Sequence, residues 1–312
     1  MAEYARAIPP SPHSARTCPP RLARKTDPAM GYIVWLASYP KSGNTWMRVF
    51  LRNLTHTSAP ADINSVAEHF PYDVAAKYYQ AIDPRPLSEY TRADVLRMRG
   101  PVQRAIAASH PKVTLVKTHS ALVIEDGFPL IDPAVTAGAI YLVRHPFDVA
   151  VSYSHHAGIS LDHAISWMNT PRSVVKGSER GVSEHFGSWS ENVQSWTRTP
   201  SKSIHVVRYE YLVAEPVKAF SGVAAFLGLG ADPARIRQAI QRSEFRRLQL
   251  QEAASGFIER PQNAQARFFR KGKIGEGQRM LSEEQKARIV AAHGEQMMTW
   301  GYQSKVQGGQ SV

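Results

Sequence analysis

Short runs of apolar residues recur along the chain, and longer segments with helical periodicity lie between them. Four runs rich in Val, Ile and Leu have the length of strands buried on both faces: residues 32–38, 112–118, 139–144 and 203–209. Helices are predicted over residues 44–54, 146–156, 215–230 and 282–301. The last of them opens with Ser282 and Gln285, a capping-box pattern. This alternation predicts one α/β domain, with a P-loop-like parallel sheet flanked by helices on both faces.

Polar or charged residues follow each of the four apolar runs. In chain order they are Lys41, then Lys117 and His119, then Arg144, and finally Arg208 to Glu210. Ligands of parallel α/β sheets bind beyond the carboxyl ends of the strands. The pattern therefore predicts that these side chains gather at one edge of the sheet and face an anion.

The composition narrows the class of protein without choosing a function. The chain has 312 residues, of which 43% are hydrophobic, enough for a sizeable core. Its formal net charge of +12 suits an anionic ligand, nucleic acid or an acidic surface, but also a merely basic surface. The single cysteine, Cys18, excludes an intrachain disulfide and a cysteine metal cluster. No apolar run approaches the ~20 residues of a membrane span, so stable membrane insertion is not expected.

The N-terminal segment differs in composition from the rest. Residues 1–29 are rich in Pro and Arg and lack the apolar core of a secretory signal, which predicts a disordered basic tail. Met30 directly precedes the first predicted strand, which leaves open that the tail is an upstream-start artefact. We expect one domain over residues 30–312 and, by default, a cytoplasmic location.

The segment YPKSGNTW, residues 39–46, places Lys41 and Gly43 where the first strand becomes a helix. A helix N-terminus offers unpaired N–H groups and a positive dipole end, so this turn favours an anion. It is not a Walker A loop, in which lysine follows the second glycine. We also find no strand-terminal aspartate to hold magnesium, which weakens a kinase interpretation, and no metal site is predicted.

Four segments resemble, in family order, motifs of the PAPS-dependent sulfotransferases (PAPS is 3′-phosphoadenosine 5′-phosphosulfate). YPKSGNTW looks like their 5′-phosphosulfate loop, and VKTH (116–119) like the strand end with the catalytic histidine. YLVRHPFDVAVSY (141–153) resembles the 3′-phosphate motif, and FFRKGKIGEG (268–277) the C-terminal R-K-G-x-x-G loop. Four ordered matches are far more specific than one glycine turn, and they imply an enzyme similar to cytosolic sulfotransferases.

The resemblance implies a binding site for PAPS and its product PAP. The 5′-phosphosulfate would be held by Lys41 and by Ser42, Gly43, Asn44, Thr45 and Trp46, whose indole would also stack on adenine. The 3′-phosphate would be held by Arg144 and Ser152, under a loop of Arg270, Lys271 and Gly272. The adenine side would be formed by Tyr209, Ser243 and Phe245. Core packing is the competing interpretation for Trp46, which lies on the apolar face of its helix.

The implied reaction is in-line, metal-independent sulfuryl transfer to a hydroxyl group. Neutral His119, with an ordinary pKa near ~6.5, would take the proton of an alcohol or phenol. Lys41 and Lys117 would stabilise the developing charge. Should His119 not be the base, the histidines to consider next are His155, His156 and His163.

Two alternatives come from other classes. A nucleoside or small-molecule kinase would need the magnesium site and the Walker A loop. A basic nucleic-acid-binding protein would spread Lys and Arg over one face with aromatic residues between them. Here the informative cations occur singly at strand ends, so no nucleic-acid partner is expected.

Departures from the family pattern carry expectations of their own. Asn44 stands where many relatives have threonine, and it can still donate a hydrogen bond. Gly277 stands where many have an aromatic residue, so we expect a more open or mobile edge there. The animal-type C-terminal dimer motif is missing, which favours a bacterial-type enzyme and leaves the oligomeric state open. The acceptor, a small apolar phenol or alcohol, is expected between the least patterned segments, about 55–110, 154–190 and 246–268.

Overall fold

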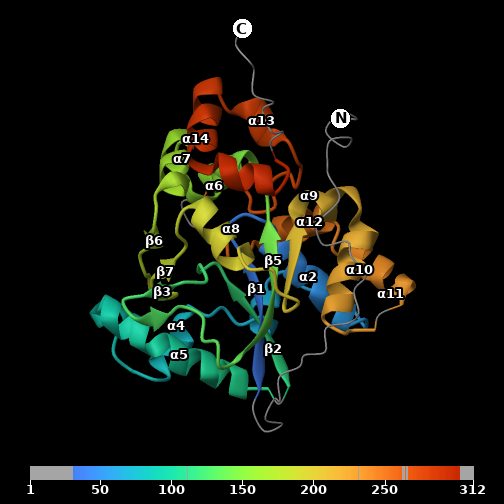
Figure 1. Ribbon diagram of the computed structural model, residues 1–312. Coiled ribbons are helices and arrows are strands. Elements are labelled where there is room, and N and C mark those ends of the chain that lie inside the picture. Colours follow the sequence, from blue (N-terminus) through green and yellow to red (C-terminus); the bar gives the residue numbers. More distant parts are fainter. Residues whose placement is uncertain (1–30, 111, 231, 262–263, 265, 303–312) are drawn as a thin grey trace.

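A four-stranded parallel sheet forms the centre of the computed structural model (Figure 1). The structure describes residues 31–110, 112–230, 232–261, 264 and 266–302, so the predicted tail over 1–29 lies outside it. The strands follow the order β2 (Val113–Thr118), β1 (Tyr32–Ser38), β5 (Thr136–Val143) and β8 (Ile204–Arg208). Two small antiparallel pairs join β3 (Ile124–Glu125) to β4 (Phe128–Pro129) and β6 (Val174–Val175) to β7 (Glu184–His185). All four predicted strands are present, and β5 begins at Thr136, before the predicted residue 139.

Helices cover both faces of the sheet (Figure 1). One face carries α2 (Asn44–Thr55), α9 (Tyr209–Ala214), α10 (Pro216–Phe226), α11 (Pro233–Arg242) and α12 (Phe245–Ser255). The other carries α5 (Arg92–Ala108), α6 (Pro146–Ala157), α7 (Leu161–Asn169), α8 (Trp189–Thr197) and α14 (Glu283–Thr299). Short helical turns complete the described part: α3 (Val66–His69), α4 (Ala76–Gln80), the 3-10 turn η1 (Leu87–Glu89) and α13 (Glu276–Met280).

The central strands feed two separate hydrophobic cores. Trp35 of β1 and Tyr141 of β5 lie in the core beneath α5 to α8, whereas Leu36 and Ile140 lie in the core beneath α2 and α10. Consecutive strand residues point to opposite faces, so each strand must be apolar at every position when both faces are covered. This explains the continuous apolar runs and confirms the predicted α/β fold.

Helix ends follow local chemistry. Ser282 and Gln285 form the predicted capping box of α14, each side chain bonding the backbone N–H of the other. The prediction for α10 was too long, because the helix ends at Phe226. Gly228 and Gly230 then adopt φ of +65° and +54°, which stops the helix. None of the described helices combines the length and the apolar character that a membrane span needs.

Candidate active site

The carboxyl ends of the strands open into one cavity of about 920 Å³. Residues from the ends of all four strands line it: Lys41 after β1, Lys117 and His119 at β2, Arg144 after β5 and Tyr209 after β8. The cavity is of the size that small-molecule sites have in general. The structure thus brings Lys41, Lys117, His119 and Arg144 together at one edge of the sheet. The prediction is wrong for Arg208 and Glu210, which do not line the cavity and form an ion pair with each other.

The turn between β1 and α2 leaves hydrogen-bond donors unused. Lys41 and Gly43 both have positive φ, of 67° and 102°, which turns the chain sharply into the helix. A Cβ at position 43 would lie 2.8 Å from the Tyr209 ring, so glycine is needed there. No side chain caps α2, and the Ser42 hydroxyl is buried without a hydrogen-bond partner among the described residues. Unpaired donors at a helix N-terminus suit an anion.

Lys41 has an unusually low pKa for a lysine. Burial, followed by the nearby charges of Arg144 and Lys117, lowers the pKa of Lys41 to about 7. Its ammonium lies 3.9 Å from the centroid of the Phe268 ring. An anion beside Lys41 would favour the charged form. Anion binding and protonation of Lys41 are therefore coupled.

Arg144 connects two loops at the cavity wall. Its Nη1 donates to the Lys41 carbonyl at 3.0 Å and its Nη2 to the Lys273 carbonyl at 3.1 Å, while its guanidinium lies 4.2 Å from the Tyr209 ring centroid. Its Nε is also buried and has no partner within the described part of the chain. Ser152 lines the same cavity from α6. Arg144 and Ser152 thus both line the cavity and carry N–H and O–H donors for a phosphate.

The predicted closing loop carries its own counter-ion. Arg270 and Lys271 both pair with the Glu276 carboxylate, at 2.7 Å from Arg270 Nη1 and 2.6 Å from Lys271 Nζ. Burial would raise the pKa of Glu276, but these hydrogen bonds outweigh it and lower the pKa to about 2. Gly272 has φ +61°, and a Cβ there would lie 2.5 Å from the Phe245 ring. The loop is therefore packed on Phe245, and Glu276 offsets one of its two positive charges.

The expectation that Gly277 leaves this edge of the cavity open is wrong. Gly277 is buried, and its N–H donates to Asp148 Oδ1 at 2.7 Å. A Cβ at this position would lie 2.3 Å from the backbone carbonyl carbon of Phe147. Glycine closes this edge by direct backbone contact with α6, and a larger residue would force the two segments apart.

Trp46, Tyr209 and Phe245 are aromatic residues that line the cavity. The Trp46 indole N–H donates to the Ser243 carbonyl at 2.9 Å, and its ring meets Tyr209 edge-on at 5.8 Å and Phe220 at 5.4 Å between centroids. Trp46 therefore takes part in core packing and also faces the cavity. The two interpretations of this residue are compatible.

Two predicted donor-site residues use their side chains inside the fold. The Ser243 hydroxyl is fully buried, donates to the Ala239 carbonyl at 2.7 Å and does not line the cavity. The Asn44 amide donates to the Leu36 carbonyl at 2.8 Å and accepts from Arg48 Nε at 3.1 Å. Asn44 thus stabilises the turn, and only its backbone N–H remains for an anion.

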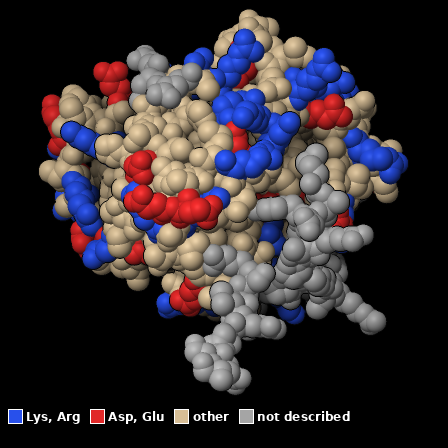
Figure 2. All heavy atoms as spheres, turned by 90° about the horizontal axis from the view of Figure 1, so that it is seen from above, with Lys and Arg blue, Asp and Glu red and all other residues tan. Residues whose placement is uncertain are grey.

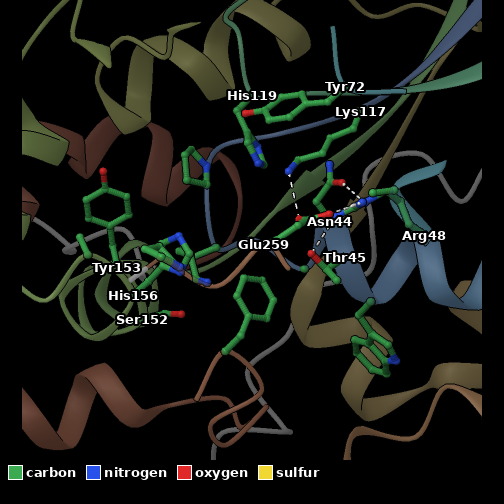
Figure 3. A pocket seen from close by; sticks show the side chains of 18 of the residues that line it. Asn44, Thr45, Arg48, Tyr72, Lys117, His119, Ser152, Tyr153, His156 and Glu259 are labelled. Carbon is green, nitrogen blue, oxygen red and sulfur yellow. Dashed lines mark hydrogen bonds and ion pairs between the residues drawn. The ribbon is translucent and has the colours of Figure 1, made fainter. Parts of the chain in front are cut away.

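His119 is fixed in the form that a base needs. Its Nδ1 lies 2.8 Å from the Ser38 carbonyl, which can only accept, so Nδ1 carries the proton and Nε2 keeps its lone pair. Burial, followed by the charge of Lys117, holds the pKa of His119 well below 6.5. Its backbone N–H donates to Glu184 Oε1 at 2.8 Å, and Tyr72 packs edge-on against the ring (Figure 3). The imidazole is therefore neutral and held in one orientation.

Sequence reasoning missed two charged residues that line the cavity, Arg48 and Glu259. Arg48 pairs with Glu259, which also accepts from Lys117 Nζ at 3.2 Å, and the Lys117 ammonium lies 4.0 Å from the Tyr72 ring centroid (Figure 3). Arg48 could have been found from its spacing of four residues after Asn44 on a helix. No motif points to Glu259, which lies 211 positions from Arg48.

The three unpatterned segments do form the other wall of the cavity. They contribute mainly apolar and aromatic side chains, among them Phe70, Tyr72, Val74, Tyr78, Val182, Phe186 and Ile258. Of the three alternative histidines, His156 lines the cavity, whereas His155 and His163 are not among its lining residues. Burial, followed by the charge of Lys41, lowers the pKa of His156 to about 3.

The comparisons with known proteins define the class. Residues 33–301 match the family model described as the sulfotransferase domain, so the chain belongs to the sulfotransferase family and is an enzyme of that family. Sulfotransferase 2B1 of Homo sapiens is 22% identical over 280 residues, which cover 88% of this chain and 69% of that protein. Cytosolic sulfotransferase 16 of Arabidopsis thaliana is 27% identical over 285 residues, covering 86% and 75% respectively.

Solved structures agree on the fold. A retinol dehydratase in complex with androsterone and PAP superposes with a TM-score of 0.58 at 18% identity, covering 89% of this chain and 83% of that one. A mouse sulfotransferase complexed with PAP gives 0.56 at 18% identity, with coverage of 85% and 84%. At these identities the likeness establishes the fold alone.

Proposed function

We propose that the protein transfers a sulfuryl group from PAPS to the hydroxyl of a small apolar phenol or alcohol. The observation that carries the proposal is the position of His119. Its free Nε2 belongs to the same cavity wall as Lys117 and as the uncapped turn with Lys41. The buried, unpartnered Ser42 hydroxyl and Arg144 Nε fit an anionic donor with two phosphate positions. Both solved relatives described above contain PAP.

The donor half would be assembled from the turn and its neighbours. Lys41, Thr45 and the backbone N–H groups of residues 42–46 would hold the 5′-phosphosulfate. Arg144 and Ser152 would hold the 3′-phosphate, and the adenine would lie by Trp46, Tyr209 and Phe245, beneath Arg270, Lys271 and Gly272. PAPS supplies the sulfuryl group and, as PAP, its leaving group.

His119 would act on the acceptor. Its Nε2 accepts the proton that the acceptor hydroxyl loses as its oxygen bonds to sulfur and the bond from sulfur to the 5′-phosphate oxygen breaks. Lys41 and Lys117 stabilise the negative charge that moves onto the leaving phosphate. No metal is required in this proposal, because cationic side chains meet the charge. The aromatic wall of Phe70, Tyr78 and Phe186 favours an apolar acceptor body.

The wider setting is also a proposal. A cytoplasmic location is supported by the word cytosolic in the names of plant relatives. A bacterial source rests on the missing dimer motif alone, while the relatives described above come from an animal and a plant. On the face seen in Figure 2, lysines and arginines form separate groups with acidic residues among them, which does not favour a nucleic-acid partner.

A thermal-shift experiment tests the donor. PAP without magnesium should raise the melting temperature, because a ligand of the folded state stabilises by about 2.7 kcal/mol at 100 times its Kd. ATP, which lacks the 3′-phosphate, should stabilise much less. Stronger stabilisation by ATP with magnesium would replace this proposal with the kinase alternative. Arg144→Ala should erase the preference for PAP over 5′-AMP, and an unchanged preference would mean that the 3′-phosphate lies elsewhere.

A further inference from the structure

Arg48, Lys117 and Glu259 form a compact ion-paired group in the lining of the cavity (Figure 3). The Arg48 guanidinium donates from Nη1 and Nη2 to the two Glu259 oxygens, at 2.7 and 2.8 Å. Lys117 Nζ adds a third bond at 3.2 Å. The Arg48 side chain is 1% exposed, so its charge is shielded from water. The fork of two guanidinium donors and the single ammonium face the same point and form a binding site for an oxyanion, which we call the oxyanion seat.

Arg48 is held by the donor-binding turn and not only by Glu259. Its Nε donates to Asn44 Oδ1 at 3.1 Å, and its Nη2 also donates to Thr45 Oγ1 at 2.9 Å. Both partners lie in the first turn of α2, where the helix N-terminus is uncapped. The guanidinium would therefore keep its position if another oxyanion replaced the Glu259 carboxylate.

Glu259 is carried by a segment with fewer constraints. It lies beyond α12, next to Ile258, which is 54% exposed. Ile258 is held by an Asn64 side chain, whose oxygen accepts from the Ile258 N–H at 2.9 Å, and by Arg180, which donates to the Ile258 carbonyl at 3.2 Å. Both bonds are solvent-exposed. Arg48 thus belongs to the rigid half of the seat, and Glu259 to the half that can give way.

The chemistry of Glu259 does not suit a base. Burial alone would raise the pKa of Glu259, but Arg48 and Lys117 outweigh it and hold the pKa well below its usual range. The carboxylate is therefore a stable anion next to Lys117, a residue proposed to stabilise the reaction. A sulfuryl group brought to the same place would meet a like charge at short range, which disfavours binding unless the carboxylate moves away.

We propose that Arg48 binds the transferring sulfuryl group, and that Glu259 occupies this seat in the free protein and competes with it. The inference rests on the proposed function, because it assigns residues to the sulfuryl end of that donor site. It makes a specific distinction between the two nucleotides. PAPS must displace Glu259, whereas PAP, which lacks the sulfuryl group, can bind with Glu259 still seated.

Glu259→Gln tests the competition. Dissociation constants for PAPS and for PAP, measured without acceptor by titration calorimetry, are the readout. The variant should bind PAPS about tenfold more tightly, because the competing carboxylate charge is lost. Its dissociation constant for PAP should stay within about twofold of that of the parent protein. Glu179→Gln removes an exposed carboxylate near Arg180 and is the matched control for net charge. It should leave both constants unchanged.

Arg48→Lys tests the seat itself. The variant keeps the charge but loses the fork, so PAPS should bind about tenfold more weakly and single-turnover transfer should slow by about 10². PAP affinity should stay within about twofold. If Arg48→Lys fails to fold, the PAPS-to-PAP ratio of Glu259→Gln decides alone.

The proposal expects opposite changes in PAPS affinity, tighter binding for Glu259→Gln and weaker binding for Arg48→Lys. Weaker PAPS binding by Glu259→Gln would make Glu259 a permanent partner that orients Arg48, and would overturn the competition. Equal changes for PAP and PAPS in both variants would assign Arg48 to the 5′-phosphate and overturn the sulfuryl seat. A parent protein that binds neither nucleotide would instead refute the proposed function.

Discussion

The donor half and the acceptor half of the cavity are built in different ways. In the donor half, short loops directly after strands present backbone groups and cations, tied by bonds such as that from Arg144 to the Lys41 carbonyl. In the acceptor half, long connections present apolar side chains. Isolated β-bridges hold them, one from Tyr72 to Lys117 of β2 and one from Ala75 to Gly181. Loop geometry fixes the first, and side-chain packing fixes the second.

This difference predicts which property, nucleotide affinity or acceptor recognition, a substitution in each half should change. Changes in the donor half should alter nucleotide affinity, because the backbone and the cations there face the anion. Changes of the apolar side chains in the acceptor half should alter acceptor recognition alone. His119 stands between the halves, since its ring bonds Ser38 of the donor side and packs against Tyr72 and Phe186 of the acceptor side.

Loss of His119 should produce the largest effect. His119→Ala should slow single-turnover sulfuryl transfer by about 10²–10⁴, the range for a lost general base, with PAP affinity nearly intact. A more acidic phenol should recover part of the rate, because it needs less help to ionise. His163→Ala, on the exposed surface of α7, is the control and should transfer at the parent rate. A variant that lost PAP binding but kept its saturated rate would direct the search for the base to His156.

Lys41→Met should weaken nucleotide binding and also slow sulfuryl transfer, because the charge of Lys41 is used in the ground state and in the transition state. We expect about 10²-fold weaker PAP binding and slower transfer. The pKa of Lys41 in the protein without nucleotide is about 7, so PAP binding above that pH requires uptake of a proton by Lys41. PAP affinity should therefore fall as pH rises from 7 to 9, and Lys41→Met should remove that slope. A parent affinity independent of pH would show that Lys41 does not bind the anion.

Gly43→Ala should weaken the donor half by a smaller factor. Its Cβ would meet the Tyr209 ring at 2.8 Å, so the turn must shift, and we expect about tenfold weaker PAP binding with about 1–3 kcal/mol of lost stability. Gly127→Ala is the matched control. Position 127 also has positive φ, +83°, but a Cβ there meets nothing within 4 Å. It should lose stability through strain without any change in PAP affinity, and equal PAP losses in both variants would argue against a local effect at the turn.

Phe186→Leu should have the smallest effect and act only on the acceptor side. Phe186 is buried with its ring centroid 6.0 Å from that of His119, so its loss loosens the acceptor wall. We expect a rise of several-fold in acceptor KM, below the tenfold that ~1.4 kcal/mol represents, with an unchanged Kd for PAP. Steady-state kinetics and PAP titration check the two constants. A parallel loss of PAP affinity would remove the distinction between the halves.

Much of the fold and of the donor half was predictable from local sequence. The apolar runs marked all four strands of the sheet, and the strand-end residues Lys41, His119 and Arg144 do meet in one cavity. No helix is predicted from the sequence over α5 or α8, although each has a readable capping box, Thr91 with Asp94 and Ser188 with Glu191. These signals are local, because strand burial, helix caps and tight turns depend on neighbouring residues.

The remaining features depend on which distant segments meet. The sequence by itself determined the β1–α2 turn, the order of the motifs and the character of the sheet. Only the tertiary structure decided that Glu259 pairs with Arg48, that Glu184 holds the backbone of His119, and that Gly277 packs on α6. These contacts join residues far apart in the chain, and their strength comes from burial, where charges and polar groups need partners that no local pattern specifies.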